Sequence, residues 1–199
     1  MNAFFAYLYR LRLIRRWSLM RNVMPENVAE HSYHVALLTH ALCTIGIEVF
    51  GKKIPVEKAV TLALFHDVTE VITGDIPSPV KHHNDKLLGG FRELENLAAE
   101  RLCDMIPEPL HRHYRPLIHG EDGDLHHWVK AADLLDAYLK CEMEISAGNR
   151  EFAVARQEIE RRLQSLDMPE VDYFLRHFGS SFTRTLDELH DMDDSDVNR

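Results

Sequence analysis

The sequence has few of the features that mark disulfide-stabilised, nucleic-acid-binding or membrane proteins. Its 199 residues include only three cysteines, without CxxC spacing, which argues against a disulfide framework or a zinc knuckle. There is no basic excess, and the net charge of −9 is unlike that of a dedicated nucleic-acid binder. No apolar run approaches the roughly 18 residues that a membrane span needs. We therefore expect a globular protein that binds neither nucleic acid nor membrane, with the cytoplasm as its simplest location.

Acidic residues are concentrated at the C-terminal end of the chain. Residues 187–199 carry six carboxylates and one base, Arg199, so this short segment accounts for −5 of the total charge. Runs of like charge are usually solvated rather than packed. The sequence therefore predicts one domain over residues 1–186 and an acidic, disordered tail over residues 187–199.

Apolar residues recur every three or four positions along most of the sequence, which is the pattern of amphipathic helices. Turn residues such as Gly51 and Gly74 separate the periodic segments. The expected helices cover residues 2–14, 29–50, 55–73, 84–105, 107–118, 125–147, 150–166 and 169–178. No segment alternates as a strand does. The sequence predicts an all-α, single-domain helical bundle, with two polar, ordered loops at 15–28 and 74–84 that are dense enough in polar groups to form a site.

Ionisable side chains lie on the apolar stripes of three expected helices. His31 begins one stripe, His66, Asp67 and Glu70 end another, and Asp133 lies at the edge of a third. Taken singly, His31 fits a core histidine whose hydrogen bonds are made within the protein, and Asp133 fits an acidic residue on the helix surface. Taken together, they would cost several kcal/mol to bury unless they are paired or bind a cation. Two imidazoles and two carboxylates suit a divalent ion such as Mn, Co, Fe, Ni, Zn or Mg.

The order His31, His66-Asp67, Asp133 resembles the signature of the HD-domain metal-dependent phosphohydrolases. The segments RRWSLMRNVMPENVAEHS, FHDVTEVITGDIPSPVK and VKAADLLDAYLKC look like those of the bacterial 5′-deoxynucleotidases, and the likeness covers residues 4–186. The resemblance implies an HD-type bundle with the metal site in its core. It also implies that these four residues hold a divalent cation (Co, Mn or another transition metal), and that the chain is a homodimer acting on deoxyribonucleoside 5′-monophosphates.

The same resemblance implies roles for residues near the metal. Arg16 is expected to orient the phosphate, and Trp17 to close the sugar side of the pocket against a 2′-hydroxyl group. Glu70 and Asp75 complete the expected catalytic residues as acid and base, in an order that the sequence leaves open. The other residues expected to contact the substrate are His31, Asp67, Ile76, Pro77, Ser78 and Asp133.

Two other interpretations fit these residues. One is an HD-domain hydrolase of another nucleotide, which usually needs further phosphate-binding motifs that this sequence lacks. The other is a non-catalytic metal- or nucleotide-binding module, which has no use for the charged face formed by Arg16, Glu70 and Asp75. No serine or cysteine with a base beside it marks a covalent nucleophile. We therefore favour direct hydrolysis by water.

Overall fold

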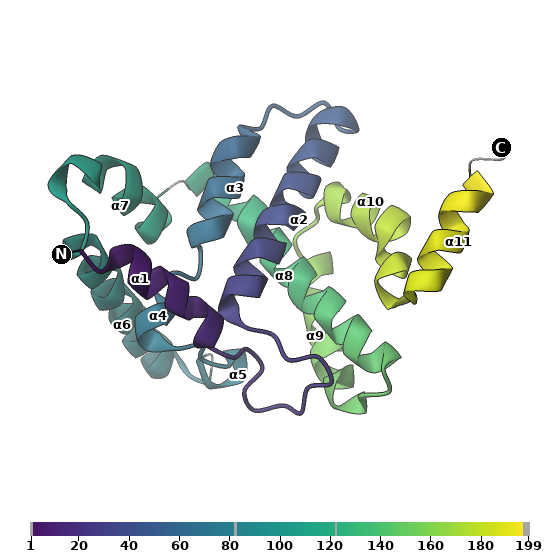
Figure 1. Cartoon of the computed structure of the whole chain (residues 1–199), viewed down its shortest axis with the longest axis horizontal. Coiled ribbons are helices and arrows are strands. Elements are labelled where there is room, and N and C mark those ends of the chain that lie inside the picture. The colour runs from purple at the N-terminus through teal and green to yellow at the C-terminus, as the bar shows by residue number, and fades with distance from the viewer. Residues whose placement is uncertain (1, 82, 122, 197–199) are drawn as a thin grey trace.

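The computed structural model describes residues 2–81, 83–121 and 123–196, and its elements are helices joined by turns (Figure 1). No strand occurs in these ranges, and an isolated antiparallel bridge pairs Arg15 with Asn27. The elements are α1 (Phe4–Leu8), η1 (Tyr9–Leu13), α2 (Val28–Glu48), α3 (Val56–Phe65), α4 (Glu70–Thr73), α5 (Ser78–Lys81), α6 (Asp85–Asp104), η2 (Glu108–Leu110), α7 (His111–His119), α8 (Gly123–Ser146), η3 (Arg150–Phe152), α9 (Ala153–Gln164), α10 (Pro169–Phe178), η4 (Gly179–Thr183) and α11 (Leu186–Asp196). The predicted all-α architecture is confirmed. Among the described helices, none is long and apolar enough to cross a membrane.

Two apolar clusters hold the helices together. The larger is built from α2, α3, α8, α9 and α10, and it includes the fully buried side chains of Leu135 and Phe152. The smaller joins α1 to α6 and α7 around Phe4 and Leu102, and it includes Val68 from the turn after α3. Because α2 and α8 pack side by side at the centre of the molecule (Figure 1), side chains on their facing surfaces are held in fixed positions.

Helix α2 begins with a reciprocal cap that its sequence specifies. The Asn27 side chain accepts a hydrogen bond from the backbone N–H of Glu30 (3.1 Å), and the Glu30 carboxylate accepts one from the N–H of Asn27 (3.3 Å). Such a capping box satisfies two amides that would otherwise lack partners. It fixes the first turn of α2, and with it the position of His31.

The expected helix over residues 55–73 is interrupted where the histidine–aspartate pair lies. Residues 66–69 form turns, and the backbone N–H of Glu70 donates to the carbonyl of Asp67 (3.0 Å), a spacing of three residues rather than four. Neighbouring side chains on an α-helix diverge by about 100°, but this tighter turn brings the two together. The Nε2 atom of His66 lies 3.1 Å from Oδ2 of Asp67.

The predicted loop before α2 is fixed at its tip by a buried carboxylate of α8. Glu144 accepts hydrogen bonds from the backbone N–H groups of Val23 (2.9 Å) and Met24 (3.0 Å) and from the amide of Asn149 (2.7 Å). Its other neighbour is Lys140, whose Nζ lies 2.5 Å away. Burial raises the pKa of Glu144, but these donors outweigh burial and lower it to about 2. The loop is therefore an ordered part of the domain.

The acidic segment is largely helical in the structure, and its disorder stays a prediction. Residues 187–196 belong to α11, whose start carries a second capping box between Thr185 and Glu188, with bonds of 2.8 and 3.3 Å. The T-x-x-E spacing in the sequence was the signal for this helix, although the acidic composition suggested otherwise. Residues 197–199 lie outside the described part of the chain, and the boundary at 186 stays a prediction.

Candidate metal centre and active site

Side chains from three separate parts of the chain converge on one point. His31 comes from α2, His66 and Asp67 from the turn after α3, and Asp133 from α8. The Nε2 atom of His31 lies 3.4 Å from Oδ2 of Asp67 and 3.4 Å from Oδ1 of Asp133. Ligand atoms of His31, His66 and Asp133 all lie within 4.8 Å of one another. The structure thus brings together the four residues that the sequence predicts as metal ligands.

Hydrogen bonds orient both imidazole rings so that Nε2 faces this point. The Nδ1 atom of His31 lies 2.7 Å from a carboxylate oxygen of Asp136, and that of His66 lies 2.7 Å from the carbonyl oxygen of Ala63. These oxygens accept, so each Nδ1 carries a proton. Both Nε2 atoms are buried without a hydrogen-bond partner in the described residues. Metal-binding histidines have this arrangement, so the residues present fit a divalent cation.

The two carboxylates of the cluster favour their ionised forms. Burial alone would raise the pKa of Asp67, but His66 and His31 hold it well below its usual range. Burial likewise opposes ionisation of Asp133, yet His31 and Lys130 outweigh it and lower its pKa. Lys130 also fixes the second oxygen of Asp133, with Nζ 2.8 Å from Oδ2. Both aspartates are therefore available as anionic ligands.

A proton and a cation compete for the same nitrogen of His31. Burial and the charge of Arg16 lower the pKa of His31, but the carboxylates of Asp133, Asp136 and Asp67 outweigh them and raise it well above its usual value. A cation at Nε2 would displace the proton that Asp67 and Asp133 otherwise attract there.

Arg16 reaches the cluster from the loop before α2. Its Nη1 atom lies 3.8 Å from Oδ2 of Asp67, and its Nε atom lies 3.1 Å from Oε1 of Glu26. The neighbouring Trp17 donates its indole N–H to Oε2 of Glu26 (3.2 Å), and its ring packs against Phe152 with 5.3 Å between the ring centroids. Arg16 is therefore at the cluster as predicted, whereas the contact of Trp17 with a sugar stays a prediction.

Glu70 and Asp75 have carboxyl groups that hold protons more readily than usual. Burial and the charges of Asp67 and Asp75 raise the pKa of Glu70 to about 9, against the opposing charge of Arg16. Burial also raises the pKa of Asp75, again against Arg16. Oε2 of Glu70 is buried and has no hydrogen-bond partner among the described residues. Perturbed carboxyl groups beside a metal-binding cluster are typical of catalytic sites.

Residues 3–182 match the model of the YfbR-like 5′-deoxynucleotidase family. The chain belongs to this family. The resemblance found in the sequence motifs is thereby confirmed.

Similar proteins cover nearly the whole chain. A 5′-deoxynucleotidase of Klebsiella pneumoniae is 46% identical over 193 residues, which is 94% of each chain. The 5′-deoxynucleotidase YfbR of Shigella boydii is 45% identical over 188 residues, again 94% of each. Among solved structures, an HD-domain phosphohydrolase of Listeria innocua is 26% identical, with a TM-score of 0.78, and the match covers 90% of this chain and 87% of that one. The HD-type bundle is thus confirmed.

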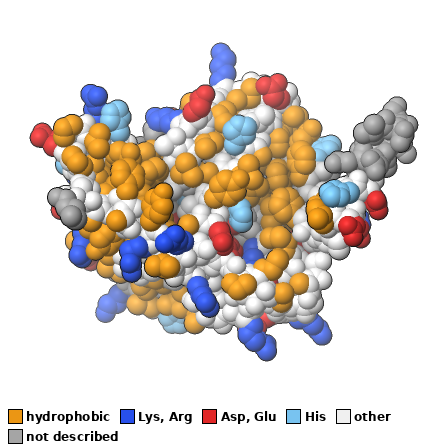
Figure 2. Space-filling model, in the orientation of Figure 1, with side chains coloured by type: hydrophobic (Ala, Val, Ile, Leu, Met, Phe, Trp, Pro, Cys, Tyr) orange, Lys and Arg blue, Asp and Glu red, His pale blue; other side chains and the backbone are white. Residues whose placement is uncertain are grey.

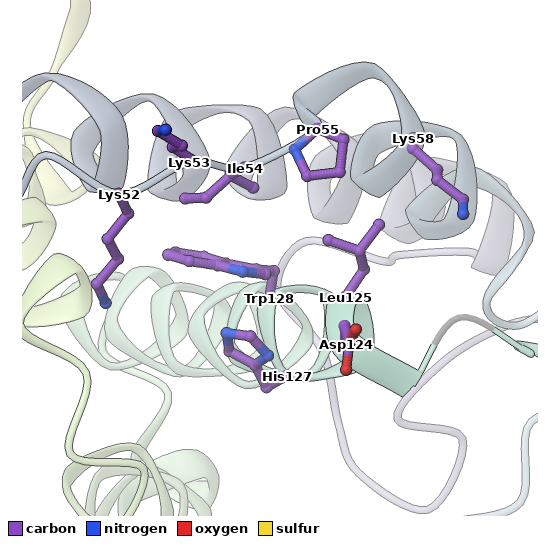
Figure 3. Close-up of a pocket in the computed structure, with 9 residues that line it drawn as sticks. All are labelled: Lys52, Lys53, Ile54, Pro55, Lys58, Asp124, Leu125, His127 and Trp128. Carbon is purple, nitrogen blue, oxygen red and sulfur yellow. The ribbon is translucent and has the colours of Figure 1, made fainter.

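An open cavity lies elsewhere on this YfbR-like chain, and none of the candidate metal ligands lines it. It has a volume of about 560 Å³ and lies beside the N-terminal ends of α3 and α8 (Figure 3). Its lining residues are Lys52, Lys53, Ile54, Pro55, Lys58, Asp124, Leu125, His127 and Trp128. Lys52 pairs with the buried Glu170 (2.6 Å) and lies over the ring of Trp128. Because no candidate ligand or catalytic residue lines this cavity, the cluster is the candidate active site of the family member.

Three residues predicted to contact the substrate lie near the start of α5, and two carboxylates that the sequence did not assign contact residues of the site. Ile76 and Pro77 are half-buried between α4 and α5, and Ser78 begins α5 and is exposed; their contact with substrate stays a prediction. Sequence reasoning assigned no role to Glu26 or Asp136, which are both buried and contact Arg16 and His31. Asp136 stood at the edge of an apolar stripe, which was a weak signal. Glu26 lies in a polar loop, where the sequence gives no signal of a role in the site.

Proposed function

We propose that this chain is a metal-dependent 5′-deoxynucleotidase, which hydrolyses deoxyribonucleoside 5′-monophosphates to deoxynucleosides and phosphate. The observation that carries the proposal is the convergence of two oriented imidazoles and two ionised carboxylates beside a half-buried arginine. His31, His66, Asp67 and Asp133 hold the divalent cation, which is Co, Mn or another transition metal. When bound, the cation supplies positive charge that offsets the negative charge of the phosphoryl oxygens.

Arg16 binds and orients the phosphate group. Burial opposes its charge, but the carboxylates of Glu26 and Asp67 outweigh burial and raise its pKa above the ordinary value. The guanidinium is therefore charged at every working pH, and its planar array of donors matches two phosphate oxygens. Nε of Arg16 faces Glu26, and Nη1 lies near Asp67, one of the proposed ligands. A phosphate group bound beside that ligand therefore interacts with the guanidinium and with the cation at the same time.

Glu70 and Asp75 carry the proton transfers of hydrolysis. A water molecule attacks phosphorus as the bond to the 5′-oxygen breaks, so the water loses a proton and the leaving oxygen gains one. One carboxyl group accepts the first proton and the other donates the second. Both carboxyl groups have raised pKa values, and carboxyl groups that hold protons more readily suit such exchange. The pH profiles of variants at each position will show which residue is the acid and which is the base.

The substrate's sugar and base occupy the space bounded by Trp17 and the segment of Ile76, Pro77 and Ser78. Contacts with Phe152 and Glu26 hold the indole of Trp17 in place, so it forms a rigid wall. An apolar wall alone rejects an added hydroxyl group only weakly. Strong preference for deoxyribose therefore requires a steric clash between this ring and a 2′-hydroxyl group.

We also propose that two copies of the chain form a homodimer. Figure 2 shows hydrophobic side chains spread over the face that α1, α2 and α3 form, and Tyr33, Leu37 and Leu64 on α2 and α3 are exposed. Burial of such a surface favours association. Light scattering coupled to gel filtration tests this, and a monomer at micromolar concentration contradicts it. The cytoplasm stays the predicted location.

Phosphate release from nucleotides tests the enzymatic proposal. We expect the metal-loaded protein to release phosphate from dAMP or dTMP with Mn or Co, much faster than from AMP. dATP and a cyclic nucleotide in the same assay test the alternative hydrolase activities. Absence of phosphate release from every nucleotide across a panel of metals would contradict the enzymatic proposal, whereas equal rates for dAMP and AMP would contradict only the role of Trp17.

Substitution of Glu70 separates catalysis from metal binding. Because Glu70 is not among the proposed ligands, Glu70→Ala should abolish turnover and leave the cation bound. Metal content of the purified variant, measured by atomic emission, checks the second part. Loss of the cation would show that Glu70 is a ligand instead.

A further inference from the structure

Glu26 is a buried carboxylate that joins two residues of the proposed substrate site. Its side chain is 9% exposed. One oxygen, Oε1, lies 3.1 Å from Nε of Arg16, and the other, Oε2, accepts the indole N–H of Trp17 at 3.2 Å. A single carboxylate therefore contacts both the group expected to bind phosphate and the ring expected to face the sugar.

The backbone places these three side chains together. The N–H of Arg16 donates to the carbonyl of Glu26 (3.0 Å), beside the bridge between Arg15 and Asn27. Trp17 adopts a left-handed backbone conformation with φ of 55°, which is unfavourable for a bulky residue. Such a conformation persists only where surrounding contacts determine it, and the bond to Glu26 is one of those contacts.

The two contacts of Glu26 differ in kind. The approach to Arg16 is a close ion pair that lacks the alignment of a hydrogen bond, since neither Nε of Arg16 nor Oε1 of Glu26 has a hydrogen-bond partner among the described residues. The contact with Trp17 is an aligned hydrogen bond. Negative charge therefore holds the guanidinium, whereas an acceptor of either charge state holds the indole.

His31 does not depend on Glu26 for its orientation. Oε1 of Glu26 lies 3.6 Å from Nδ1 of His31, but the proton on that nitrogen is donated to Asp136, at 2.7 Å. A change at Glu26 should therefore leave the affinity for the cation almost unaltered. This separates Glu26 from the residues that hold the metal ligands.

We propose that Glu26 is a positioning residue, which fixes the guanidinium of Arg16 by its charge and the indole of Trp17 by its hydrogen bond. Phosphate binding and discrimination against a 2′-hydroxyl group then depend on the same carboxylate. The inference rests on the proposed function, because it assumes that Arg16 and Trp17 face the substrate.

Two substitutions separate the charge from the hydrogen bond. Glu26→Gln removes the charge but keeps an oxygen that can accept from the indole, so we expect KM for dAMP to rise about 10-fold or more while kcat changes less than about 3-fold. The ratio of kcat/KM for dAMP to that for AMP should stay at the wild-type value. Glu26→Met removes both contacts, so the ratio should fall as well.

Glu144→Gln is the matched control. It alters another buried carboxylate that holds the same loop, through Val23 and Met24, without contacting Arg16 or Trp17. We expect it to lower the stability and to leave KM and the dAMP-to-AMP ratio within about 3-fold of wild type. Equal kinetic changes in Glu26→Gln and Glu144→Gln would overturn the proposal, as would a wild-type KM in Glu26→Gln.

Binding and spectroscopic measurements supply readouts that do not need turnover. The dissociation constant for Co should change less than about 3-fold in both Glu26 variants, whereas that for inorganic phosphate should rise with KM. In protein labelled with 5-fluorotryptophan, the chain gives two resonances, and Trp17→Phe assigns one to Trp17. That resonance should shift in Glu26→Met and not in Glu144→Gln; an unshifted resonance in Glu26→Met would overturn the role of the hydrogen bond.

A fallback variant and the fluorine resonance distinguish failure of this proposal from failure of the proposed function. If Glu26→Gln fails to fold, Glu26→Asp withdraws the charge by one methylene group, and a raised KM at unchanged kcat supports the proposal whereas a wild-type KM overturns it. A wild-type protein that releases no phosphate from any nucleotide contradicts the proposed function instead, and the fluorine resonance then still reports whether Glu26 positions Trp17.

Discussion

The carboxylate of Asp136 is expected to set the affinity of the cluster for its cation. It is 7% exposed, and its Oδ2 atom lies 2.7 Å from Nδ1 of His31. Burial raises the pKa of Asp136, but His31 and His34 outweigh burial and lower it to about 2. The group is therefore ionised at any pH at which the enzyme is assayed, and its charge strengthens Nε2 of His31 as an electron-pair donor.

The substitution Asp136→Asn changes this charge with little change of shape. The amide oxygen can still accept from Nδ1, so the tautomer of His31 is retained, but a charge-assisted bond is replaced by a neutral one. Such a bond loses about 1–2 kcal/mol, which corresponds to about 5- to 30-fold weaker binding of the cation. Substitutions of partners that orient metal-bound histidines typically cost 10–100-fold, so we expect a loss of about 10-fold.

Competition with a fluorescent chelator for Mn or Co measures this affinity. Glu142→Gln is a suitable control, because Glu142 lies on the same helix and pairs with Arg156 (2.6 Å) rather than with His31. The control should bind the cation as the wild type does. A folded Asp136→Asn protein whose dissociation constant is within 2-fold of wild type would refute the assignment of His31 as a ligand oriented by Asp136.

Three further outcomes concern stability. Glu144→Ala leaves the partners of a buried ion pair uncompensated, so urea denaturation should show a loss of about 3–5 kcal/mol in the free energy of unfolding; a loss below 1 kcal/mol would contradict the buried pair. Because the pKa of folded Glu144 is about 2 and its ordinary value is 4.5, its contribution is complete above pH 4.5 and is lost as the pH falls toward 2. Stability measured over this range should therefore fall less steeply in Glu144→Gln, and an unchanged slope would be inconsistent with the lowered pKa. Gly46→Ala would place a methyl group 2.7 Å from Ile54 Cδ1 and 2.9 Å from Trp128 Cη2, so thermal denaturation should show a cost of about 1–3 kcal/mol, whereas Gly89→Ala, with open space around it, should show none.

The helices and the convergence of the candidate ligands could be predicted because both depend on local pattern. His31 and Asp133 lie on helices whose apolar stripes specify which side is buried, so the convergence of their side chains follows from packing those stripes together. The turn at residues 66–69 could not be predicted in this way, because its sequence continues the helical period of α3. Tertiary contacts of Val68 with the smaller apolar cluster accompany the departure from the helix.

The partners of the predicted residues could not be found from sequence. Glu26 is ten residues from Arg16 and Asp136 is 105 residues from His31, and neither pair has a spacing that a helix or strand would impose. The bridge at Arg15, the backbone hydrogen bond between Arg16 and Glu26, and the packing of α2 on α8 bring them into contact. Long-range pairs of this kind depend on the assembled fold and produce no periodic pattern in the sequence.

The position of the proposed ligands along the chain links cation binding to folding. His31, His66 and Asp133 are separated by 35 and 67 residues, so a cation held by them acts as a reversible cross-link between distant segments. Binding to the native state alone adds about 1.4 kcal/mol of stability for each tenfold excess of free metal over its dissociation constant. The melting temperature thus becomes a measure of metal occupancy, and a chelator that abolishes turnover should lower it by an amount that reports how tightly the cation was held.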